Sequence, residues 1–328
     1  THTLECATLT ITAGTLDTAN KTLTVTGTVT LADGDLLLNV SEVTIGGFSV
    51  TGDGEMTGTT HTNGLIVLGN WRSAGSRFNN ADGKVVFKGS SGGTIAMNGA
   101  GGTGEGFYDV EINIAGQTYT VNEWDLTGIE RNLTITAGTL STGSNLALTV
   151  TGEVSIAGTL TGNASAITIG KMLEITNGGT YNETSGTTLI SGQPDGDYVL
   201  RNHDGGTYTK HATGILKIAR TSASGTKYAK FGEDVYNDVK LENTSSGSVV
   251  AIVGVMNLAG DLTVVEGELR SYGGTGAIDV DGNVSIEDGG KFSTETTQLA
   301  AGGVNADFGS LTIASGGEYD ATPLTTTI

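Results

Sequence analysis

The sequence has few cysteines, prolines, aromatic residues and basic residues. With Cys6 as its single cysteine, the chain cannot form an intrachain disulfide, and we expect a free thiol rather than pairing between chains. Aromatic residues make up 5% of the chain, which is little for antiparallel sandwiches, whose cores usually contain a buried Trp or Tyr. No apolar run reaches the length of a membrane-spanning helix. The 16 Lys and Arg stand against 35 Asp and Glu, a net charge of −19 that disfavours nucleic acid and anionic membranes as partners.

What the sequence does contain is an internal repeat. The segment Leu9-Thr-Ile-Thr-Ala-Gly-Thr-Leu-Asp-Thr18 returns as Leu133-Thr-Ile-Thr-Ala-Gly-Thr-Leu-Ser-Thr142, with a single change. A looser third copy begins at Leu262. Similarity at a long, regular spacing indicates an array built from one structural unit.

The repeat divides the chain into three units. Phe107–Asn113 matches Tyr236–Glu242, and the shift between them (236 − 107 = 129) also relates Leu133 to Leu262. We therefore expect an N-terminally incomplete unit at 1–106, a complete one at 107–235 and a C-terminally incomplete one at 236–328, stacked continuously. Thr1 already lies inside the pattern, so we expect a processed product or an excerpt.

Within each unit the local pattern is that of short β-strands. Segments such as Leu-Thr-Ile-Thr alternate apolar and polar residues, and Gly or Asx-Gly pairs close them. This favours an all-β fold, a parallel β-solenoid (β-helix) with roughly 20 residues per turn. Tandem antiparallel β-sandwich domains, one per repeat, are the alternative.

The order of these segments resembles a known kind of module. Phe107-Tyr-Asp-Val-Glu-Ile112, Leu133 to Leu140, Leu148-Thr-Val-Thr-Gly-Glu-Val-Ser-Ile156 and Gly178-Gly-Thr-Tyr181 follow one another as in extracellular microbial "β-strand repeat" modules. Such modules occur in adhesin-like, S-layer-like and sheath-like surface proteins. The resemblance implies a β-solenoid at the cell surface and carries no catalytic residue across.

Asp-Gly corners are candidate calcium sites. Carboxylates beside turn carbonyls are hard oxygen ligands that suit Ca²⁺. The candidates lie in three corners: Asp33 and Asp35, Asp195 and Asp197, and Asp279 and Asp281. The competing interpretation is ordinary turn chemistry, without any cofactor, and we favour it.

The second unit contains a basic insertion at about 193–235. The interval from Gly89 to Phe107 in the first unit is 107 − 89 = 18, whereas the equivalent interval from Gly192 to Tyr236 is 236 − 192 = 44, an excess of 44 − 18 = 26. Insertions in repeat arrays usually form loops on one face. We expect a loop that contacts a neighbouring copy, or an anionic glycan, through Arg201, Lys210, Lys217, Arg220, Lys227 and Lys230; the alternative is a solvated extension.

Three classes of function are compatible with these features. The favoured one is a non-catalytic structural protein of a microbial extracellular surface, which self-assembles end to end into a filament, sheath or S-layer-like wall, or forms an adhesin stalk. The second is a glycan-binding adhesin or phage fibre that uses exposed aromatics such as Trp71, Trp124 or Tyr208. The third is a polysaccharide-degrading solenoid enzyme, for which no spacing singles out an acid pair.

Overall fold

The computed structural model describes residues 3–98, 105–192, 196–220, 225–244, 248–272, 277–293, 305–320 and 326–327. By its contacts the chain forms two compact units. Unit 1 comprises Thr1–Gly152 and Ala157–Ser165, and unit 2 comprises Glu153–Ile156 and Ala166–Ile328. Each unit is a parallel β-solenoid, as the sequence predicts, and not a row of antiparallel sandwiches. The three repeat units remain a prediction about domains.

The described residues of unit 1 form seventeen strands and a short 3-10 helix, η1 (Gly75–Arg77). The strands are β1 (Leu4–Cys6), β2 (Leu9–Ile11), β3 (Thr15–Asp17), β4 (Leu23–Leu31), β5 (Asp35–Asn39), β6 (Val43–Val50), β7 (Met56–Thr59), β8 (Leu65–Val67), β9 (Trp71–Ala74), β10 (Phe78–Asn79), β11 (Lys84–Phe87), β12 (Gly93–Asn98), β13 (Asp109–Val121), β14 (Leu126–Ile129), β15 (Leu133–Ser141), β16 (Leu148–Val150) and β18 (Thr159–Thr161).

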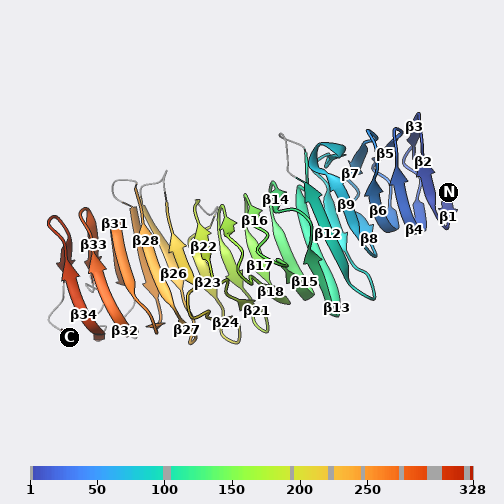
Figure 1. Ribbon diagram of the computed structural model, residues 1–328. Coiled ribbons are helices and arrows are strands. Elements are labelled where there is room, and N and C mark those ends of the chain that lie inside the picture. The colour runs from blue at the N-terminus through green and yellow to red at the C-terminus, as the bar shows by residue number, and fades with distance from the viewer. Residues whose placement is uncertain are drawn as a thin grey trace. The chain divides into compact units, whose positions relative to one another are not determined.

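Unit 2 contains the remaining strands, labelled where room allows in Figure 1. They are β17 (Val154–Ile156), β19 (Ile167–Ile169), β20 (Leu173–Ile175), β21 (Thr180–Asn182), β22 (Thr187–Ile190), β23 (Tyr198–Asn202), β24 (Thr207–Thr209), β25 (Ile215–Ile218), β26 (Gly225–Lys230), β27 (Val235–Tyr236), β28 (Asp238–Glu242), β29 (Ser248–Val253), β30 (Met256–Leu258), β31 (Leu262–Tyr272), β32 (Ala277–Ile286), β33 (Gly290–Ser293), β34 (Asn305–Ile313), β35 (Glu318–Asp320) and β36 (Thr326–Thr327).

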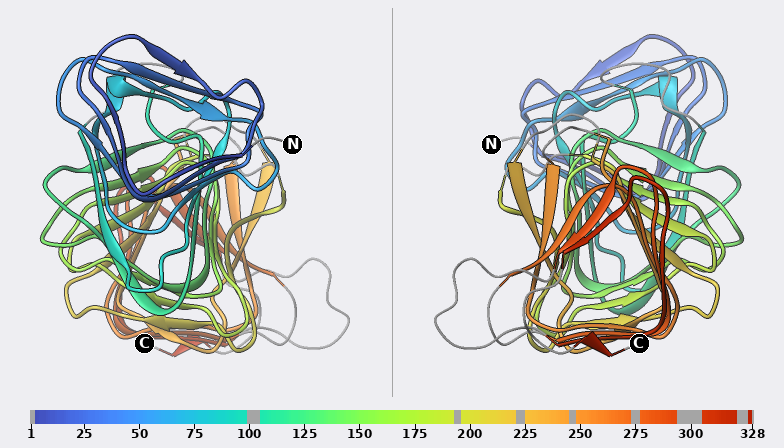
Figure 2. Two further views of the ribbon diagram at one scale, coloured as in Figure 1. Left: turned by 90° about the vertical axis from the view of Figure 1, so that its right-hand side faces the viewer. Right: turned by 90° about the vertical axis from the view of Figure 1, so that its left-hand side faces the viewer.

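The turns of the solenoid, called coils below, stack in register. Equivalent residues of successive coils therefore lie above one another and form columns. In unit 1 one column runs through β1, β4, β6, β8, β11, β13 and β15, each strand parallel to the next. Its inward members from β4 onward are fully buried aliphatic residues: Leu23, Val43, Leu65, Val85, Val110 and Leu133. Alternate residues of each strand point inward, which is why the Leu-Thr-Ile pattern specifies the interior. The left view of Figure 2 shows the coils of unit 1, coloured from blue to green, winding around this interior.

The sequence repeat is also a repeat of polar contacts inside unit 1. Thr18 Oγ1 lies 2.7 Å from Ser41 Oγ, and Ser165 Oγ donates to Thr142 Oγ1 at 2.8 Å. The two pairs are related by the same shift along the chain that relates Leu9 to Leu133. All four hydroxyl side chains are buried. The hydroxyls satisfy one another, so the interior tolerates them.

No described helix is long and apolar enough to cross a membrane. Cys6 lies half-buried in β1 and forms no disulfide.

Candidate functional site: the added coil of unit 2

The described residues of the insertion at about 193–235 form an additional coil and not a loop, so this expectation was wrong. In unit 1, β11 pairs directly with β13, with Lys84 opposite Asp109. In unit 2 the equivalent strands β22 and β28 are separated by β25, which pairs with both. The register steps from Thr187 to Ile215 and on to Asp238, intervals of 215 − 187 = 28 and 238 − 215 = 23. The excess of 26 in the sequence is therefore the length of one coil, and the ladder continues without interruption.

This coil surrounds a buried carboxylate. Glu183 follows β21, and its side chain is almost fully inaccessible. The hydroxyl of Tyr208, in β24, donates to Glu183 Oε1 at 2.7 Å, and the amide of His211 donates to Oε2 at 2.9 Å. Tyr181, one coil earlier in register with Tyr208, lies edge-on to it and bonds Thr188 Oγ1 at 2.6 Å. Each carboxylate oxygen thus has a partner from the added coil.

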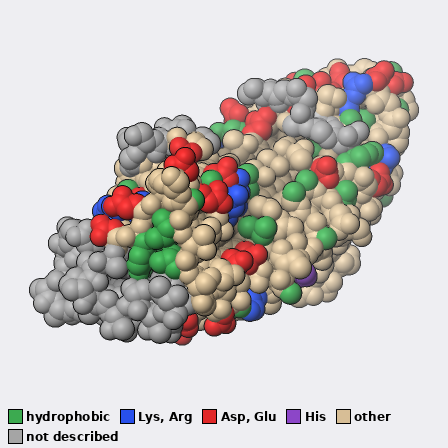
Figure 3. All heavy atoms as spheres, turned by 60° about the vertical axis from the view of Figure 1, so that its left-hand side comes forward, with side chains coloured by type: hydrophobic (Ala, Val, Ile, Leu, Met, Phe, Trp, Pro, Cys, Tyr) green, Lys and Arg blue, Asp and Glu red, His purple; other side chains and the backbone are tan. Residues whose placement is uncertain are grey.

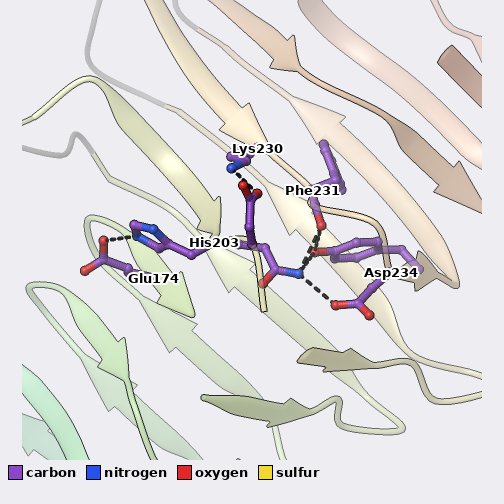
Figure 4. A network of polar contacts seen from close by, with 8 residues as sticks. Glu174, His203, Lys230, Phe231 and Asp234 are labelled. Carbon is purple, nitrogen blue, oxygen red and sulfur yellow. Dashed lines mark hydrogen bonds and ion pairs between the residues drawn. The ribbon is translucent and has the colours of Figure 1, made fainter. Parts of the chain in front are cut away.

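A second buried network includes Phe231 and Asp234, which are labelled in Figure 4. Asn202 Nδ2 donates to Asp234 Oδ2 at 2.9 Å and to the carbonyl of Phe231 at 3.0 Å. Asp234 Oδ2 also accepts the amide of Tyr208 at 2.6 Å. The hydroxyl of Tyr236 donates to the Phe231 carbonyl at 2.8 Å, and its ring lies 4.0 Å from that of Tyr208. The two networks therefore meet at Tyr208.

On the outer side of the same coil, polar contacts are partly exposed (Figure 4). His203 Nε2 lies 2.8 Å from Glu174 Oε1, on the preceding coil, and Arg201 Nη1 lies 3.6 Å from the same oxygen. Lys230 Nζ donates to Asp204 at 2.7 Å. These contacts join three successive strands of one column, β20, β23 and β26.

Burial governs the ionisation of the inner groups. Desolvation raises the pKa of Glu183, although the hydrogen bonds from Tyr208 and from the His211 amide oppose the rise. Desolvation also raises the pKa values of Tyr181, Tyr208 and Tyr236, so the three phenols stay neutral hydrogen-bond donors. Apart from Asn202 Oδ1, which has no hydrogen-bond partner among the described residues, the donors and acceptors of the inner network are satisfied, and they fix the added coil to its neighbours.

Most of the predicted basic contacts have partners within the chain. Lys217 Nζ lies 2.7 Å from Glu242 Oε2, Lys230 pairs with Asp204, and Lys227 Nζ donates to the carbonyl of Gly196 at 2.6 Å. Arg201 combines its contact to Glu174 with a position over the ring of Tyr198, and Lys210 is exposed. A role in assembly stays a prediction for these residues.

Arg220 is not a surface residue, which corrects its assignment as an assembly contact. Its side chain is fully buried, and Nη1 donates to the carbonyls of Gly225 and Val249 at 3.1 and 3.0 Å. Nε and Nη2 have no hydrogen-bond partner among the described residues. Desolvation lowers the pKa of this guanidinium. The sequence gives no sign of this burial, because the accepting carbonyls come from later segments.

The candidate calcium residues lie in separate corners, and two of them accept backbone amides. Asp33 Oδ1 accepts the amide of Asp53 at 3.2 Å, and Asp35 Oδ1 accepts the amide of Glu55 at 3.1 Å, each from the next coil. Asp197, Asp279 and Asp281 are exposed, while Asp195 lies outside the described residues. No group of three or more metal-ligating side chains occurs in the described part of the chain. Calcium binding stays a prediction.

The aromatic residues named as candidates for glycan recognition are largely interior. Trp71 is fully buried in contact with Phe48, Phe78 and Phe107, and Tyr208 is 3% exposed. Only Trp124 of the three is partly exposed, with Arg72 over its ring. The sequence prediction was therefore wrong for Trp71 and Tyr208.

Three other tyrosines, which the local sequence patterns do not single out, form a partly exposed row. The rings of Tyr198 and Tyr228 lie 5.7 Å apart between centroids, and those of Tyr228 and Tyr272 lie 5.1 Å apart. Tyr198 and Tyr228 are half-buried, and Tyr272 is 40% exposed. The three are far apart in sequence, so only the stacking of coils brings them together. We call Tyr198, Tyr228 and Tyr272 the tyrosine row.

Comparisons with known proteins do not assign a family. No protein-family model and no curated protein matches the chain. One solved structure, the crystal structure of a TibA fragment hyper-glycosylated by TibC, is similar over 99% of this chain and 97% of its own, with 14% identity and a TM-score of 0.37. So distant a likeness leaves the function to be argued from the chain itself.

Proposed function

We propose that the chain is a non-catalytic structural solenoid of a microbial extracellular surface, part of a filament, sheath, S-layer-like wall or adhesin stalk, which assembles by adding coils to its ends. The observation that carries this proposal is the edge formed by β1, β2 and β3. Among the described residues each of these strands pairs on one side only, with β4 or β5. Unpaired edges of this kind template the addition of further strands.

The internal repeat indicates what covers such an edge. The segment Leu9–Thr18, which includes β2 and β3, has its copy at Leu133–Thr142. That copy is covered by β13, which pairs in parallel with β15, with Val110 opposite Leu133 and Tyr119 opposite Leu140. We infer that a coil of the same kind from a second copy of the chain covers the first coil in the same way; residues preceding Thr1 in a longer protein would cover it by the same pairing. This contact is heterologous, so it propagates into an open assembly.

The edge formed by β1, β2 and β3 exposes apolar surface, and burying this surface would be favourable. A hollow of about 410 Å³ is lined by residues of the first and second coils, among them Leu4, Leu16 and Leu23. Leu4 is 44% exposed, whereas Leu23, its partner in the next coil, is fully buried. Covering the hollow would give the first coil the environment that the second already has.

Assembly is tested at Thr10, which is exposed in the middle of β2. The carbonyl of the next residue, Ile11, accepts the amide of Ala32, so the polar backbone groups of Thr10 face away from β4. Thr10→Pro removes an outward donor without removing a ladder hydrogen bond. Thr10→Val keeps the donor and the β-branched shape.

The readouts are sedimentation velocity over a range of concentrations and negative-stain electron microscopy. We expect the wild type and Thr10→Val to assemble as concentration rises, and Thr10→Pro to stay monomeric with an unchanged melting curve. A wild-type chain that stays monomeric at every concentration, or a Thr10→Pro variant that assembles equally well, would refute end-to-end addition.

Contacts between the sides of neighbouring copies are the remaining part of the proposal. The chain carries a net charge of −19, and Asp and Glu side chains are spread over the face in Figure 3. The exposed Lys210 can approach such an acidic flank in another copy. Lys210→Glu is expected to weaken assembly at low salt, and Lys88→Glu, at an exposed position after β11 and away from the edge hollow, is the matched control. Equal effects of both substitutions would count against a specific contact.

A further inference from the structure

We propose that the tyrosine row, together with Arg201, binds an acidic polysaccharide chain laid along the stacking direction of the coils. The inference does not depend on the self-assembly proposed above, because it concerns the side of unit 2 and a different kind of partner. Its first support is the regular spacing of three partly exposed rings, at 5.7 and 5.1 Å between centroids. A linear polysaccharide presents an apolar face of C–H groups at each sugar, and such faces pack on aromatic rings.

The strand register explains why the row is continuous. Tyr198 and Tyr228 are direct partners in the pairing of β23 with β26. The next coil places Ala251 opposite Tyr228, and the coil after that places Arg270 opposite Ala251, with Tyr272 two residues further along β31 and opposite Val253. Ala251 is fully buried, and its small side chain allows the rings of Tyr228 and Tyr272 to meet across it. The row therefore spans four successive coils.

The second support is the charge beside the rings. The Arg201 guanidinium lies 5.2 Å from the centre of the Tyr198 ring, and its side chain is 43% exposed. Lys227 and Lys230 lie on β26, the strand that carries Tyr228. Because Arg220 is buried, the positive charge beside the rings is that of Arg201, Lys227 and Lys230, in a chain of net charge −19.

These charges select the class of glycan. Most of the acidic protein surface repels a polysaccharide that bears carboxylates. The positive charge of Arg201 and of the neighbouring lysines attracts it. A neutral chain has only the rings. The buried phenols of Tyr181, Tyr208 and Tyr236 hold the coil from inside and are inaccessible to a ligand. The ligand class is thus a polyuronate or a similarly acidic polysaccharide.

The experiment uses the purified full chain at monomeric concentration. The probe is an oligogalacturonate, and its methyl-esterified form is the neutral counterpart of the same backbone. Titration calorimetry is expected to show binding of the acid form that weakens with salt, and weaker binding of the ester. Tyr228→Ala is expected to reduce the affinity for the acid form about tenfold, whereas Tyr228→Phe retains it because the ring remains.

The chain offers a matched control at Tyr108. This tyrosine is also half-exposed beneath an arginine, with Arg131 at 5.5 Å from its ring centre, but it does not belong to the tyrosine row. Tyr108→Ala should leave the affinity unchanged. The proposal is overturned if the wild type binds neither oligosaccharide, or if Tyr228→Ala and Tyr108→Ala bind as the wild type does.

A third outcome would overturn the glycan proposal and reassign the row to a second copy of the chain. Light scattering would then show that the wild type associates and that Tyr228→Ala does not, with no glycan bound by either. Melting curves of Tyr228→Ala and Tyr228→Phe guard against misfolding. If Tyr228→Ala does not fold, Arg201→Gln is titrated instead, and unchanged affinity for the acid form would overturn the proposal.

Discussion

The Tyr208 hydroxyl donates a 2.7 Å hydrogen bond to Glu183 Oε1 inside unit 2, where both side chains are buried. The carboxylate comes from the coil before the insertion and the phenol from the added coil. The contact therefore joins the additional coil to the coil that precedes it in the stack. It also places an ionisable group where ionisation is unfavourable, which makes the contact sensitive to pH.

Stability should depend on pH through Glu183. Burial raises its folded-state pKa above the usual value of 4.5, so the folded state binds the proton more tightly than the unfolded state does. The stabilisation is fully present below the unfolded pKa and is lost as the pH rises through the folded pKa. Glu183→Gln resembles the protonated form at every pH. The difference in melting temperature, Glu183→Gln minus wild type, should therefore become more positive between pH 4 and pH 8. A difference that stays constant over this range would contradict the prediction.

Arg220 should tolerate an apolar replacement better than a reversal of charge. Its guanidinium is buried with Nε and Nη2 unpaired among the described residues, so the charged group itself is costly to bury. Arg220→Met keeps the volume and should change the free energy of unfolding by less than about 1.5 kcal/mol. Arg220→Glu places a carboxylate against two carbonyls and should cost about 3 kcal/mol or more. Urea denaturation measures both, with exposed Lys210→Glu as the control; equal losses for Arg220→Met and Arg220→Glu would be incompatible with this argument.

Close stacking of the coils should make Gly192 intolerant of any side chain. A Cβ at Gly192 would overlap the carbonyl oxygen of Gly170, one coil earlier. Gly196 follows shortly in sequence, with open space where its Cβ would be. Gly192→Ala should lower the free energy of unfolding by about 1–3 kcal/mol, the usual range for overpacking, and Gly196→Ala should leave it nearly unchanged. Equal stability of the two variants would mean that the coils stack less closely at this corner.

The sequence predicted the parts of the fold that depend on local patterns. Alternation in segments such as Leu23–Leu31 marked which side chains turn inward, and all of its alternating aliphatic residues are fully buried. The predicted turn of roughly 20 residues holds for the first coils, where Leu4 pairs with Leu23 and Leu23 with Val43. These features are local because each strand is short and each corner has its own glycine or Asx residue.

The features that the sequence did not predict depend on register between coils. A charged insertion resembles a loop, and the clue to its true form was its excess length of 26, which lies between the intervals of 28 and 23 residues that separate β22, β25 and β28. Tyr228 and Tyr272 lie two coils apart, and their rings meet across the intervening coil, which contains Ala251. Arg220 is buried because later segments supply its carbonyl acceptors. Such contacts join residues with no local relationship, so a pattern search along the chain does not find them.

The acidic corners should stabilise the stack as hydrogen-bond acceptors even without a metal. Asp238 Oδ1 accepts the amide of Asp261 at 2.9 Å, and Asp261 Oδ1 accepts the amide of Asn283 at 2.7 Å, so one side chain per coil satisfies the next coil's backbone. Asp261→Ala removes the acceptor and should cost about 1 kcal/mol, whereas Asp261→Asn retains an acceptor oxygen and should cost less. Thermal unfolding in chelator compares the two variants directly. If Asp261→Asn lowers the stability as much as Asp261→Ala does in chelator, the charge of the carboxylate, and not the hydrogen bond that it accepts, stabilises this corner. If Asp261→Asn is less stable than the wild type only in millimolar Ca²⁺, a bound cation stabilises the corner instead.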